Sequence, residues 1–547
     1  MPLDAAQKEL EVRRSLIEDL AERSENLVYS RACDLNAEQF PDHPALIDRN
    51  NRLNWSDVKS ISDRLAMALL ESNVMRPDIA LIHLSNSAEQ FLIRLACEKA
   101  GVRVLLTNSA FRETELASLI ERTRPAVAFV SAEKAGRGDY DRLLEMLGAA
   151  GTKLQLILVG GGTQTEWARS YEALLAEAPQ VYARILDRTR FDWDERFYLT
   201  TTSGSTSAPK IADTIYGRRI WLSLRHAAGV KLQMGETIAA LPPMTSGTAD
   251  SLIHHAAPYF AATIVLENRF DPVGTSQLLV DENVHVATAV PAMLARMLAH
   301  DTIDQLSDAP LRCFATYAAA ISYELGAAVE ERACCGIVRC YGTMDFGGIS
   351  MSTLDDDRHT RIRTVGRPFV DNDLKIVDEQ GADVPAGAPG EIVMRPSRVV
   401  MGGGYFRDYR NTAKVWSEDY YRLGDLGQFD DRGNLILVGR ASELIIRGGQ
   451  NILPSEVEEL MIAHPKVIDV AVVGLPDKEM GETVCACVII EGDSALELDD
   501  VRSHFDALGV ARFKCPERIV RFDEFPVTMS GMKVDRRQLI ETLGGRS

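Results

Sequence analysis

The sequence lacks the cysteine patterns of zinc-binding and disulfide-stabilised proteins. Its nine cysteines include no Cys-x-x-Cys pair, and such pairs are the usual mark of structural zinc sites and redox motifs. The closest cysteines, adjacent Cys334-Cys335 and the pair Cys485 and Cys487, lie in apolar runs. We therefore expect reduced and buried thiols, with neither bridges nor metal ligands among them.

Long apolar runs and a secretory N-terminus are also missing. No run of about 18 or more apolar residues occurs, and Asp4, Glu9 and Glu11 stand where a signal peptide has a basic start. Lysine and arginine total 60 against 79 aspartates and glutamates, a net charge of −19. Because phosphate backbones and anionic membranes repel such a chain, we expect a cytoplasmic protein with no nucleic-acid or membrane partner.

Repeats and low-complexity tracts are absent, and the composition excludes a disordered chain. The content of 46% hydrophobic and 25% charged residues is that of an ordinary soluble protein. At 547 residues the chain exceeds what one hydrophobic core supports. Two or more domains are therefore expected.

The first half of the chain alternates helical and strand patterns. Helical spacing of apolar residues and short apolar runs follow one another in the order expected for βαβ units. The predicted helices are Asp57–Leu70, Ala88–Ala100 and Glu113–Thr123, and the predicted strands are Ile79–Leu84, Val102–Leu106, Val127–Val130 and Leu154–Val159. Gly160-Gly161-Gly162 follows the last strand, and without a Gly-x-Gly-x-x-Gly register it is interpreted as a strand exit.

The second half of the chain has a different pattern of predicted secondary structure. After Leu374, short strands and Gly/Pro turns predict a β-rich section, and from Leu444 strands and helices alternate in a compact unit of about 100 residues. The predicted fold class is therefore α/β, a large N-terminal domain of βαβ layers plus a β-rich section, followed by a small mobile α+β domain. We place these domains at 1–440 and 441–547.

The segment from Thr200 to Lys210 carries the strongest chemical signal. It reads Thr-Thr-Thr-Ser-Gly-Ser-Thr-Ser-Ala-Pro-Lys, so hydroxyl groups, a turn-forming glycine and a lysine charge lie together as in a phosphate-binding loop. A Walker-type P-loop is excluded, since Pro209 precedes the lysine and Ile211 follows it. Composition alone leaves an ordinary polar surface loop as the alternative.

Motifs further along the chain decide between these alternatives. They occur in a fixed order, and together they resemble the adenylate-forming superfamily of acyl- and aryl-CoA synthetases, luciferases and peptide-synthetase adenylation domains, over nearly the whole chain. The motifs are Tyr341-Gly-Thr-Met-Asp345, Val365-Gly-Arg-Pro, Gly387-Ala-Pro-Gly-Glu391, Tyr421-Arg-Leu-Gly-Asp425, Gly439-Arg440, Gly448-Gly449 and Pro454-Ser-Glu456.

The resemblance implies two half-reactions. A carboxylate attacks the α-phosphate of ATP to give acyl-AMP and pyrophosphate, and a thiol then converts the acyl-AMP to a thioester. It implies an AMP-forming acid:CoA ligase that uses ATP and Mg²⁺, takes coenzyme A as co-substrate, and binds a small-molecule carboxylic acid. Two alternatives stay open: a ligase that loads a separate carrier protein's phosphopantetheine, and a degenerate nucleotide-binding member without catalysis. We expect a monomer or homodimer.

The family's nucleotide site maps onto this sequence residue by residue. Tyr341 is expected to stack on adenine, Asp345 to ligate Mg²⁺, and Asp425 to accept hydrogen bonds from the ribose hydroxyls, with Arg440 on the same nucleotide. The alternatives are a simple turn for the first motif and a surface salt bridge for Asp425 and Arg440. The remaining ATP-binding candidates are Thr202, Ser203, Gly204, Ser205, Thr206, Lys210, Ala319, Gly342 and Thr343, and Thr206 is also a metal candidate.

The resemblance also assigns roles near the C-terminus. Lys533, in Pro526-Val-Thr-Met-Ser-Gly-Met-Lys-Val, matches the lysine that bridges substrate carboxylate and α-phosphate, and with Lys210 it is the predicted catalytic pair. A solvated surface lysine is the alternative. Ser442 is the predicted hinge about which the small domain rotates, and Gly448 and Gly449 are expected on the coenzyme A side.

Several positions depart from the family pattern. Ser207 and Ile211 replace glycines of the phosphate loop, and Met344 and Leu423 replace threonines. Met344 cannot donate the hydrogen bond that the family's threonine gives to the α-phosphate. These departures favour the alternative of a degenerate, non-catalytic nucleotide-binding protein. Every charged group that the chemistry requires nevertheless has a candidate residue.

The acid itself is predicted only by class. Neither the His-Asn pair of dihydroxybenzoate ligases nor the aspartate of amino-acid-activating domains is present, and small residues beside Met and Phe favour a roomy apolar pocket. An aromatic or alicyclic acid is therefore expected, although a misplaced loop register is the alternative. The pocket candidates are Met244, Thr245, Ser246, Gly247, Ala318, Phe346 and Gly347.

Overall fold

The computed structural model describes most of the chain. Its described residues are 28–138, 140, 154–161, 168–202, 209–245, 247–369, 372–396, 404–417, 420–490, 496–527 and 534–544. Two compact units emerge, one built mainly from residues 1–362 with 368–372 and 396–414, the other from 363–367, 373–395 and 415–547. The β-rich section after Leu374 thus groups largely with the C-terminal part of the chain, while the boundary at 440/441 stays a prediction.

Unit 1 contains a seven-stranded sheet in the order β7-β6-β5-β3-β4-β8-β9. Neighbours β4, β3, β5 and β6 pair in parallel, which confirms the βαβ pattern. The strands are β3 (Ile79–His83), β4 (Arg103–Leu106), β5 (Val127–Ser131), β6 (Gln155–Val159), β7 (Ala168–Ser170), β8 (Arg196–Thr202) and β9 (Lys210–Ile215). The accompanying helices are α2 (Tyr29–Gln39), α3 (Trp55–Glu71), α4 (Ala88–Ala100), α5 (Glu113–Thr123), α6 (Ala132–Gly136), α8 (Tyr171–Ala176) and α9 (Ala183–Thr189).

The sequence explains this sheet simply. All five residues of β3 are buried, as expected for a strand covered on both faces. Helix α4 begins after Ser87, whose hydroxyl accepts the Gln90 N–H at 3.2 Å, and ends at Gly101 with φ +74°. A serine N-cap and a left-handed C-terminal glycine are the standard boundaries of a helix.

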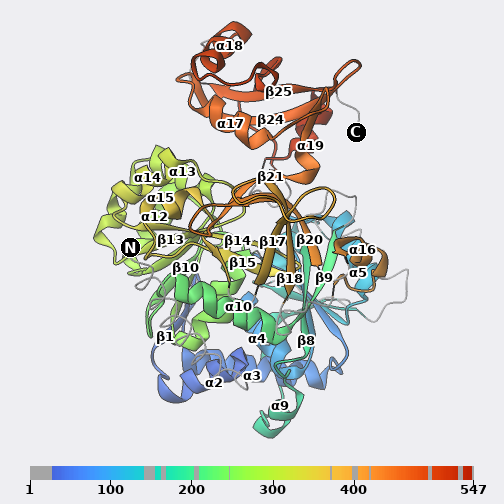
Figure 1. Cartoon of the computed structure of the whole chain (residues 1–547). Helices are drawn as coiled ribbons and strands as arrows, with labels where there is room; N and C mark the ends of the chain where they lie inside the picture. The colour runs from blue at the N-terminus through green and yellow to red at the C-terminus, as the bar shows by residue number, and fades with distance from the viewer. Residues whose placement is uncertain are drawn as a thin grey trace. The chain divides into compact units, whose positions relative to one another are not determined.

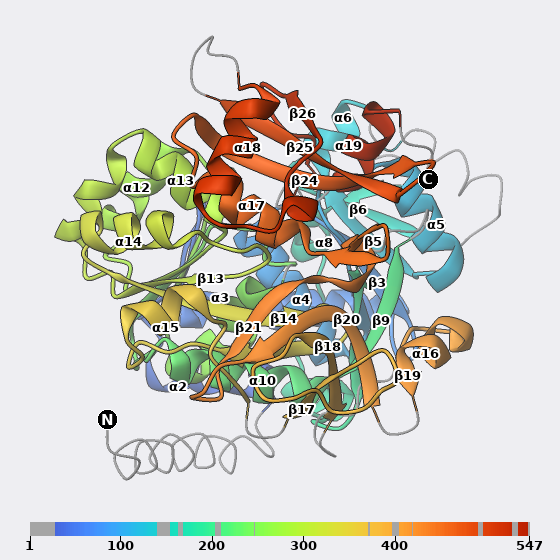
Figure 2. The same cartoon turned by 45° about the horizontal axis from the view of Figure 1, so that its top comes forward.

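Unit 1 also contains a nine-stranded sheet in the order β16-β15-β14-β13-β12-β10-β11-β1-β2. Helices α12, α13 and α14 lie beside one another next to β13 (Figures 1 and 2). The strands are β1 (Pro44–Ile47), β2 (Arg52–Asn54), β10 (Thr237–Ala240), β11 (Thr263–Leu266), β12 (Val286–Ala289), β13 (Cys313–Thr316), β14 (Gly336–Thr343), β15 (Gly347–Met351) and β16 (Arg367–Pro368). The helices are α10 (Tyr216–Gly229), α11 (Gly247–Ala249), the π-helix η1 (Asp250–Ala256), the 3₁₀ helices η2 (Ala257–Phe260) and η3 (Thr302–Asp308), α12 (Pro272–Asp281), α13 (Pro291–Ala299), α14 (Tyr323–Arg332), α15 (Arg358–Arg363) and α16 (Tyr409–Val415).

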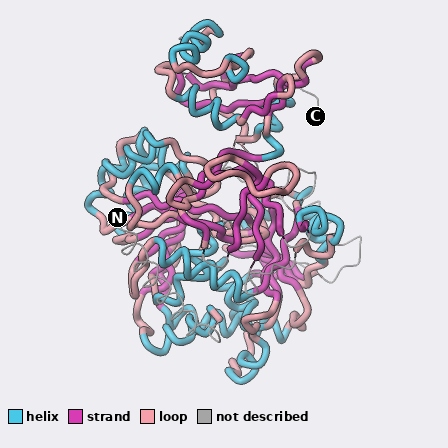
Figure 3. Tube along the Cα trace, viewed as in Figure 1, coloured by secondary structure: helices cyan, strands magenta, loops and turns pink. Residues whose placement is uncertain are grey.

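Unit 2 consists of two smaller sheets. The first has the order β17-β18-β20-β19 with β21 on β20, and the second has β23-β22-β25-β24 with β26 on β25. Figure 3 shows the second sheet with helices beside its strands. The strands are β17 (Asn372–Val377), β18 (Gly390–Pro396), β19 (Trp416–Ser417), β20 (Tyr420–Phe429), β21 (Leu435–Arg440), β22 (Ile445–Arg447), β23 (Gln450–Ile452), β24 (Val467–Asp477), β25 (Gly481–Ile490) and β26 (Arg518–Arg521). The helices are α17 (Pro454–Ile462), α18 (Leu498–Ala507), α19 (Arg536–Thr542) and the 3₁₀ turns η5 (Ala441–Glu443) and η6 (Arg512–Lys514).

The cysteines form no disulfide, as predicted, and seven of the nine are buried. The prediction of burial was wrong for Cys334, which is exposed. It has φ +52° and lies in the turn between α14 and β14, so its side chain leaves the apolar run that continues at Cys335. Among the described residues, no helix combines the length and apolarity that crossing a membrane requires.

Candidate active site

The predicted phosphate loop lies at the end of a β-hairpin in unit 1. Strands β8 and β9 are antiparallel, and Thr202 stands directly opposite Lys210. The Arg122 guanidinium donates to the Pro209 carbonyl at 2.6 Å, which fixes the chain immediately before Lys210. The tip of the hairpin, with Ser203, Gly204, Ser205 and Thr206, lies outside the described residues. The loop's phosphate-binding role therefore stays a prediction.

Tyr405 connects two of the predicted residues, and the sequence interpretation missed it. Its hydroxyl donates to Asp345 Oδ2 at 2.7 Å, and Lys210 Nζ lies 4.8 Å from the centre of its ring, within the range of a cation–π contact. Tyr405 reaches this place because it pairs with Ala212 on the edge of β9. The only sequence signal was the glycine run that precedes it at residues 402–404.

Asp345 is the predicted magnesium ligand, and its surroundings fit such an ion. The described residues contain no cluster of three or more His, Cys, Asp or Glu side chains suited to holding a metal by themselves. Mg²⁺ is usually held by one or two carboxylates together with water and substrate phosphates. A single carboxylate beside the phosphate loop therefore suits a magnesium ion that arrives with a triphosphate.

Arg219 on α10 joins the start of the phosphate loop to the Tyr341–Asp345 motif. Its Nη2 donates to the Thr200 hydroxyl at 3.2 Å and to the Met344 carbonyl at 2.8 Å, and Thr200 Oγ1 also donates to the Met344 carbonyl at 3.2 Å. Burial lowers the pKa of the Arg219 guanidinium, which is only 3% exposed. The sequence signal that was overlooked is the pair of adjacent arginines, Arg218 and Arg219, near the start of this helix.

Met344 replaces a threonine of the family pattern, and its side chain has a structural partner. The Gly247 N–H lies 3.3 Å from the Met344 sulfur, and a thioether sulfur is a weak acceptor. Gly247 is one of the predicted acyl-pocket residues. The structure thus places the two predicted regions, the Tyr341–Asp345 motif and the segment after β10, in direct contact.

Other acyl-pocket candidates surround this contact. Met244 is buried, and its N–H donates to Asn86 Oδ1 at 2.7 Å. Thr245 lies in the following turn, and Ser246 lies outside the described residues. A Cβ on Gly247 would lie 3.5 Å from the ring of Tyr317. Asn86, which the sequence interpretation also missed, holds this segment at the end of β10.

Ala318 and Ala319 lie in the turn after β13. Ala318 has φ +73°, in the left-handed region that a residue with a Cβ rarely adopts. Only glycine adopts this conformation freely, so alanine holds it at a conformational cost. Ala319 is exposed, and its predicted contact with nucleotide is not tested by the structure.

Phe346 and Gly347 lie beneath α10. Arg218 stacks on the Phe346 ring, with its Cζ 4.1 Å from the ring centre, and donates to the Phe346 carbonyl. A Cβ on Gly347 would lie 2.6 Å from a methyl group of Leu222. Helix α10 therefore packs against Phe346 and Gly347, two of the predicted pocket residues. A larger residue at position 347 would collide with this helix.

The motif residues Tyr341, Gly342 and Thr343 end strand β14. Tyr341 is buried, and the Thr343 hydroxyl accepts the Phe346 N–H at 3.1 Å. The carboxyl ends of parallel strands are where ligands usually bind in open α/β sheets. Thr200 of β8 contacts Met344, which directly follows β14, and these two strands belong to different sheets.

In unit 2, Asp425 and Arg440 face each other across β20 and β21. They are register partners, and Arg440 Nε lies 3.0 Å from Asp425 Oδ1. The carboxylate side chain is 9% exposed and the guanidinium 49%. This arrangement is compatible both with the predicted ribose contact and with the salt bridge that was its alternative.

The remaining predicted site residues of unit 2 lie in separate turns. Ser442 lies in the 3₁₀ turn η5 directly after β21. Gly448 and Gly449, with φ +54° and +79°, form the two-residue turn between β22 and β23, a turn in which both residues need positive φ. This gives them a structural role, while their coenzyme A contact stays a prediction. Lys533 lies outside the described residues.

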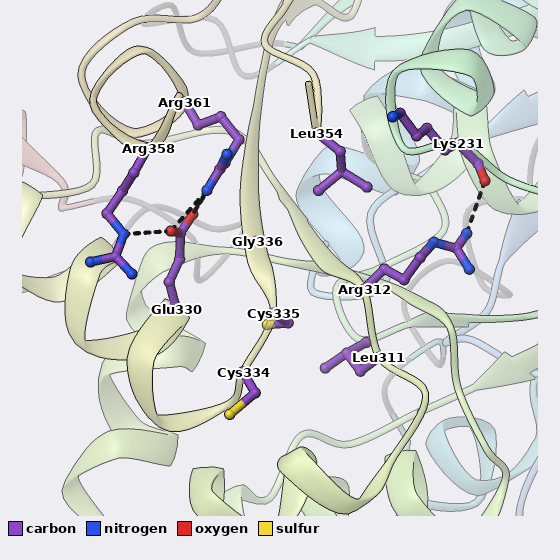
Figure 4. A pocket seen from close by; sticks show the side chains of 10 residues that line it. All are labelled: Lys231, Leu311, Arg312, Glu330, Cys334, Cys335, Gly336, Leu354, Arg358 and Arg361. Carbon is purple, nitrogen blue, oxygen red and sulfur yellow. Dashed lines mark hydrogen bonds and ion pairs between the residues drawn. The ribbon is translucent and has the colours of Figure 1, made fainter. Parts of the chain in front are cut away.

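A separate cavity of about 660 Å³ lies elsewhere in unit 1. Figure 4 shows Arg358 and Arg361 both reaching Glu330, and Arg312 reaching the Lys231 carbonyl. The cavity lies beside Gly336, at the amino end of β14. The Tyr341–Asp345 motif lies at the other end of this strand. The cavity's cations already have carboxylate partners, so this cavity is not the candidate active site.

Two family models match the chain. The model described as AMP-binding enzyme covers residues 33–406, and the model described as AMP-binding enzyme C-terminal domain covers residues 456–532. The first alone covers more than half of the chain. Both lie in the order that the motifs of the sequence predict.

Similar proteins agree with these matches. A salicylyl-CoA synthase / salicylate adenylyltransferase of a Streptomyces species is 29% identical over 523 residues, 93% of each chain. A 2-hydroxy-7-methoxy-5-methyl-1-naphthoate–CoA ligase of Streptomyces carzinostaticus is 27% identical over 520 residues, 93% of this chain and 92% of the relative. The structure of the anthranilate CoA ligase AuaEII with anthranoyl-AMP superposes with a TM-score of 0.84 at 20% identity, covering 95% of this chain and 98% of that one. The superposition confirms the predicted fold.

Proposed function

Since this chain belongs to the AMP-binding enzyme family, we propose that it is an AMP-forming acid:CoA ligase for an aromatic carboxylic acid. A carboxylate oxygen of the acid attacks the α-phosphate of ATP, and pyrophosphate leaves with the electrons of the broken P–O bond. The thiolate of coenzyme A then attacks the acyl carbon, a C–S bond forms, and AMP leaves. The enzyme is thus an adenylate-forming ligase with ATP and coenzyme A as co-substrates.

The observation that carries this proposal is the meeting of the phosphate-loop hairpin with the Tyr341–Asp345 motif. Lys210 and Asp345 are linked through Tyr405, and Thr200 contacts the Met344 carbonyl. A lysine charge and a hard carboxylate that contact the same tyrosine supply the two kinds of group that a magnesium–triphosphate complex needs. Asp345 and the loop hydroxyls would hold the ion, whose positive charge offsets the phosphate charge when it is bound.

The pocket residues support an aromatic acid. The side chains beside the motif are apolar or small, namely Met244, Gly247, Phe346 and Gly347, and no carboxylate stands among these residues to hold an ammonium group. Relatives whose names give salicylate and a hydroxynaphthoate as their acids extend over the same length of chain. We therefore assign the substrate class as aryl carboxylic acids, with the small domain turning about Ser442 between the two half-reactions.

The departures from the family pattern do not remove the required groups. Met344 loses the threonine hydroxyl, yet its carbonyl is bound by Arg219 and its sulfur by Gly247. The position of this motif is therefore fixed by contacts that do not depend on a hydroxyl at residue 344. This favours a working enzyme over a degenerate nucleotide-binding protein.

The direct experiment is product analysis with purified protein. Incubation with ATP, Mg²⁺, coenzyme A and a panel of benzoates, naphthoates and arylacetates should give AMP and an acyl-CoA, identified by mass spectrometry. Asp345→Ala is the matched inactive variant, and Asp355→Ala, whose carboxylate instead pairs with Lys231, is the control. AMP formation with a phosphopantetheinylated carrier but not with coenzyme A would establish the carrier-loading alternative. No acid-dependent AMP with either thiol would refute the proposal.

A further inference from the structure

Histidine 226, on the buried face of α10, has no evident structural use for its polar atoms. The residue is 2% exposed, and neither Nδ1 nor Nε2 has a hydrogen-bond partner among the described residues. Buried polar side chains are nearly always hydrogen-bonded in native proteins, so each exception needs an explanation. His226 is also not among the residues to which the family resemblance gives a role.

The imidazole lies against the predicted acyl pocket. A Cβ built on Gly348 would be 2.5 Å from Cε1 and 2.7 Å from Nε2 of His226, so the ring occupies the space where a side chain at position 348 would lie. Gly348 directly follows Phe346 and Gly347, two of the pocket candidates. Helix α10 contacts β15 along this stretch (Figure 1).

The helix spacing explains why these contacts occur together. Leu222 and His226 are four residues apart and therefore lie on one face of α10. Leu222 meets Gly347, and His226 meets Gly348. The two glycines let the helix approach the strand closely, and the side chains of this helix face form part of the wall beside the pocket candidates.

An aromatic ring completes the surroundings of the histidine. Phe369 lies edge-on to His226, with ring centres 5.4 Å apart and planes at 75°. The phenylalanine ring has no N–H or O–H donor and no oxygen or nitrogen acceptor, so it cannot hydrogen-bond to either nitrogen of His226. The surroundings on this side are thus apolar, which is costly for an imidazole unless a further polar group is bound.

The protonation state limits which group that can be. Burial, and to a smaller extent Arg225, lowers the pKa of His226 to about 4. The ring is therefore neutral near pH 7, with one N–H donor and one bare nitrogen as acceptor. A hydroxyl group can satisfy either atom, whereas a carboxylate can only accept and an ammonium group can only donate.

We propose that His226 determines substrate specificity by hydrogen bonding to a neutral hydroxyl substituent on the ring of the aryl acid. This inference rests on the proposed function and narrows its substrate class to hydroxylated aryl acids. Binding an acid without the hydroxyl would leave the buried imidazole without a partner. A site built to hydrogen-bond a substrate group rejects analogues that lack it more strongly than an apolar pocket discriminates by size.

The test uses matched acids and two substitutions. Rates of acid-dependent ATP–pyrophosphate exchange are compared for 2-, 3- and 4-hydroxybenzoate, 2-aminobenzoate and benzoate, and for 2-hydroxy-1-naphthoate against 1-naphthoate. The wild type should prefer one hydroxylated acid over its unsubstituted parent by about 1,000-fold or more in kcat/KM. The kcat/KM for 2-aminobenzoate should lie between those for 2-hydroxybenzoate and benzoate, because an aromatic amine donates hydrogen bonds well but accepts them poorly.

His226→Leu removes both polar atoms at similar size, and His226→Gln keeps a donor and an acceptor. Leucine should abolish the preference, mainly by lowering kcat/KM for the hydroxylated acid, while glutamine should retain part of it. Thermal unfolding of each variant verifies that it is folded. A wild type without hydroxyl preference would overturn the inference, and so would a leucine variant that keeps it or loses activity equally on both acids. Absence of exchange with every acid would instead refute the proposed function itself.

Discussion

The two units of this protein differ in how deeply their ionisable side chains are buried. In unit 1 many ionisable groups are buried, among them the Arg94–Asp250 pair at 0% and 1% side-chain exposure, Arg219 and His226. In unit 2 the ion pairs are largely exposed, and Asp425 is the one buried carboxylate among its described residues. Burying a charge is costly without close compensation, so buried charges signal a requirement other than stability.

This difference shows which polar groups deserve a functional interpretation. Asp250 is well compensated, since burial raises its pKa but Arg94, His255 and Arg219 lower it below the ordinary value. Arg219 has neutral hydrogen-bond partners, and its nearest carboxylates act only through space. In unit 2, Asp425 differs from Arg219 in having a charged partner, Arg440, so both the ribose contact and the salt bridge stay open for it.

The largest effect is expected for a unit 2 residue, Lys533. Lys533→Ala should lower the rate of adenylation by at least about 100-fold, because the predicted role of this lysine is to place a positive charge on the α-phosphate. Thioester formation from supplied acyl-adenylate and coenzyme A should be largely kept. Both half-reactions are measured separately, by pyrophosphate exchange and by acyl-CoA release.

The control for this change is Lys514→Ala, since Lys514 pairs with Glu456 on α17. That variant should keep adenylation within about twofold, as expected for a surface ion pair. Equal loss of both half-reactions in Lys533→Ala would show that the role has been assigned wrongly. It would also weaken the contrast between the units, because unit 2 would then contribute structure more than chemistry.

The next effect concerns the buried guanidinium of unit 1. Arg219→Met should lower adenylation about tenfold, because the Thr200 hydroxyl and the Met344 carbonyl both lose the guanidinium donor and keep only their direct hydrogen bond. The free energy of unfolding should change by less than about 1 kcal/mol, since the lost hydrogen bonds are offset by relief of a buried charge. Chemical denaturation and exchange kinetics measure the two quantities.

Arg332 provides the comparison for Arg219. It forms ion pairs with Asp301 and Asp304 at the surface of unit 1, so Arg332→Met should affect neither activity nor the free energy of unfolding by more than a small amount. If Arg219→Met instead lost stability and activity in proportion, Arg219 would be a structural residue. The view that unit 1 retains buried charge for function would then be contradicted.

Acidification should separate the two units. Burial lowers the pKa of His226 and His255 to about 4 and that of His83 to about 3. Below pH 6.5 the unfolded chain therefore binds protons before the folded chain does, and unit 1 loses stability as the pH falls from 6.5 to 4. In unit 2, a hydrogen bond from Arg447 contributes most to lowering the pKa of Glu517 to about 2, so this contribution is lost only between about pH 4.5 and 2.

Limited proteolysis read by mass spectrometry can follow both units in one sample. Cleavage in α10 and β3 should increase between pH 6.5 and 4, before cleavage in β22 and β25 does. His255→Gln should reduce the acid sensitivity of unit 1, whereas His300→Gln, at an exposed position, should not. Simultaneous cleavage of both units, unaffected by either substitution, would remove the proposed difference.

The smallest effect on stability is expected for Arg440→Met. Because its side chain is 49% exposed, loss of the pair with Asp425 should change the free energy of unfolding by no more than about 0.5 kcal/mol. The KM for ATP should rise severalfold if Arg440 contacts the nucleotide. Arg502→Met, which breaks an exposed pair with Asp499, should leave KM unchanged, and an unchanged KM in both variants would leave the salt bridge as the only role of Arg440.

The sequence predicted the regular elements well because their signals are local. Glu113–Thr123 was predicted as a helix and is α5 with the same bounds, since its apolar residues follow the helical period and its ends are clear. Such patterns are visible within a dozen residues. The hairpin that places Thr202 opposite Lys210 was not among the predicted elements, and only the loop between its strands was recognised from the sequence.

Contacts between distant segments could not be predicted in this way. Tyr405 meets Asp345 across 60 positions, and Arg219 meets Met344 across 125. Only the packing of two sheets and α10 brings these residues together, and no local pattern of polar or apolar residues encodes it. His226 was missed for a similar reason, because its surroundings come from Gly348 and Phe369, which lie more than a hundred residues away in sequence.

Acid-dependent exchange of labelled pyrophosphate into ATP tests the central claim most directly. The account predicts exchange that requires Mg²⁺ and an aryl carboxylic acid, needs no coenzyme A, and falls by at least about 100-fold in Lys533→Ala. Exchange that persists in this variant would contradict the assigned role. No exchange with any aryl acid, from a folded protein, would contradict the proposal that this chain activates such acids by adenylation.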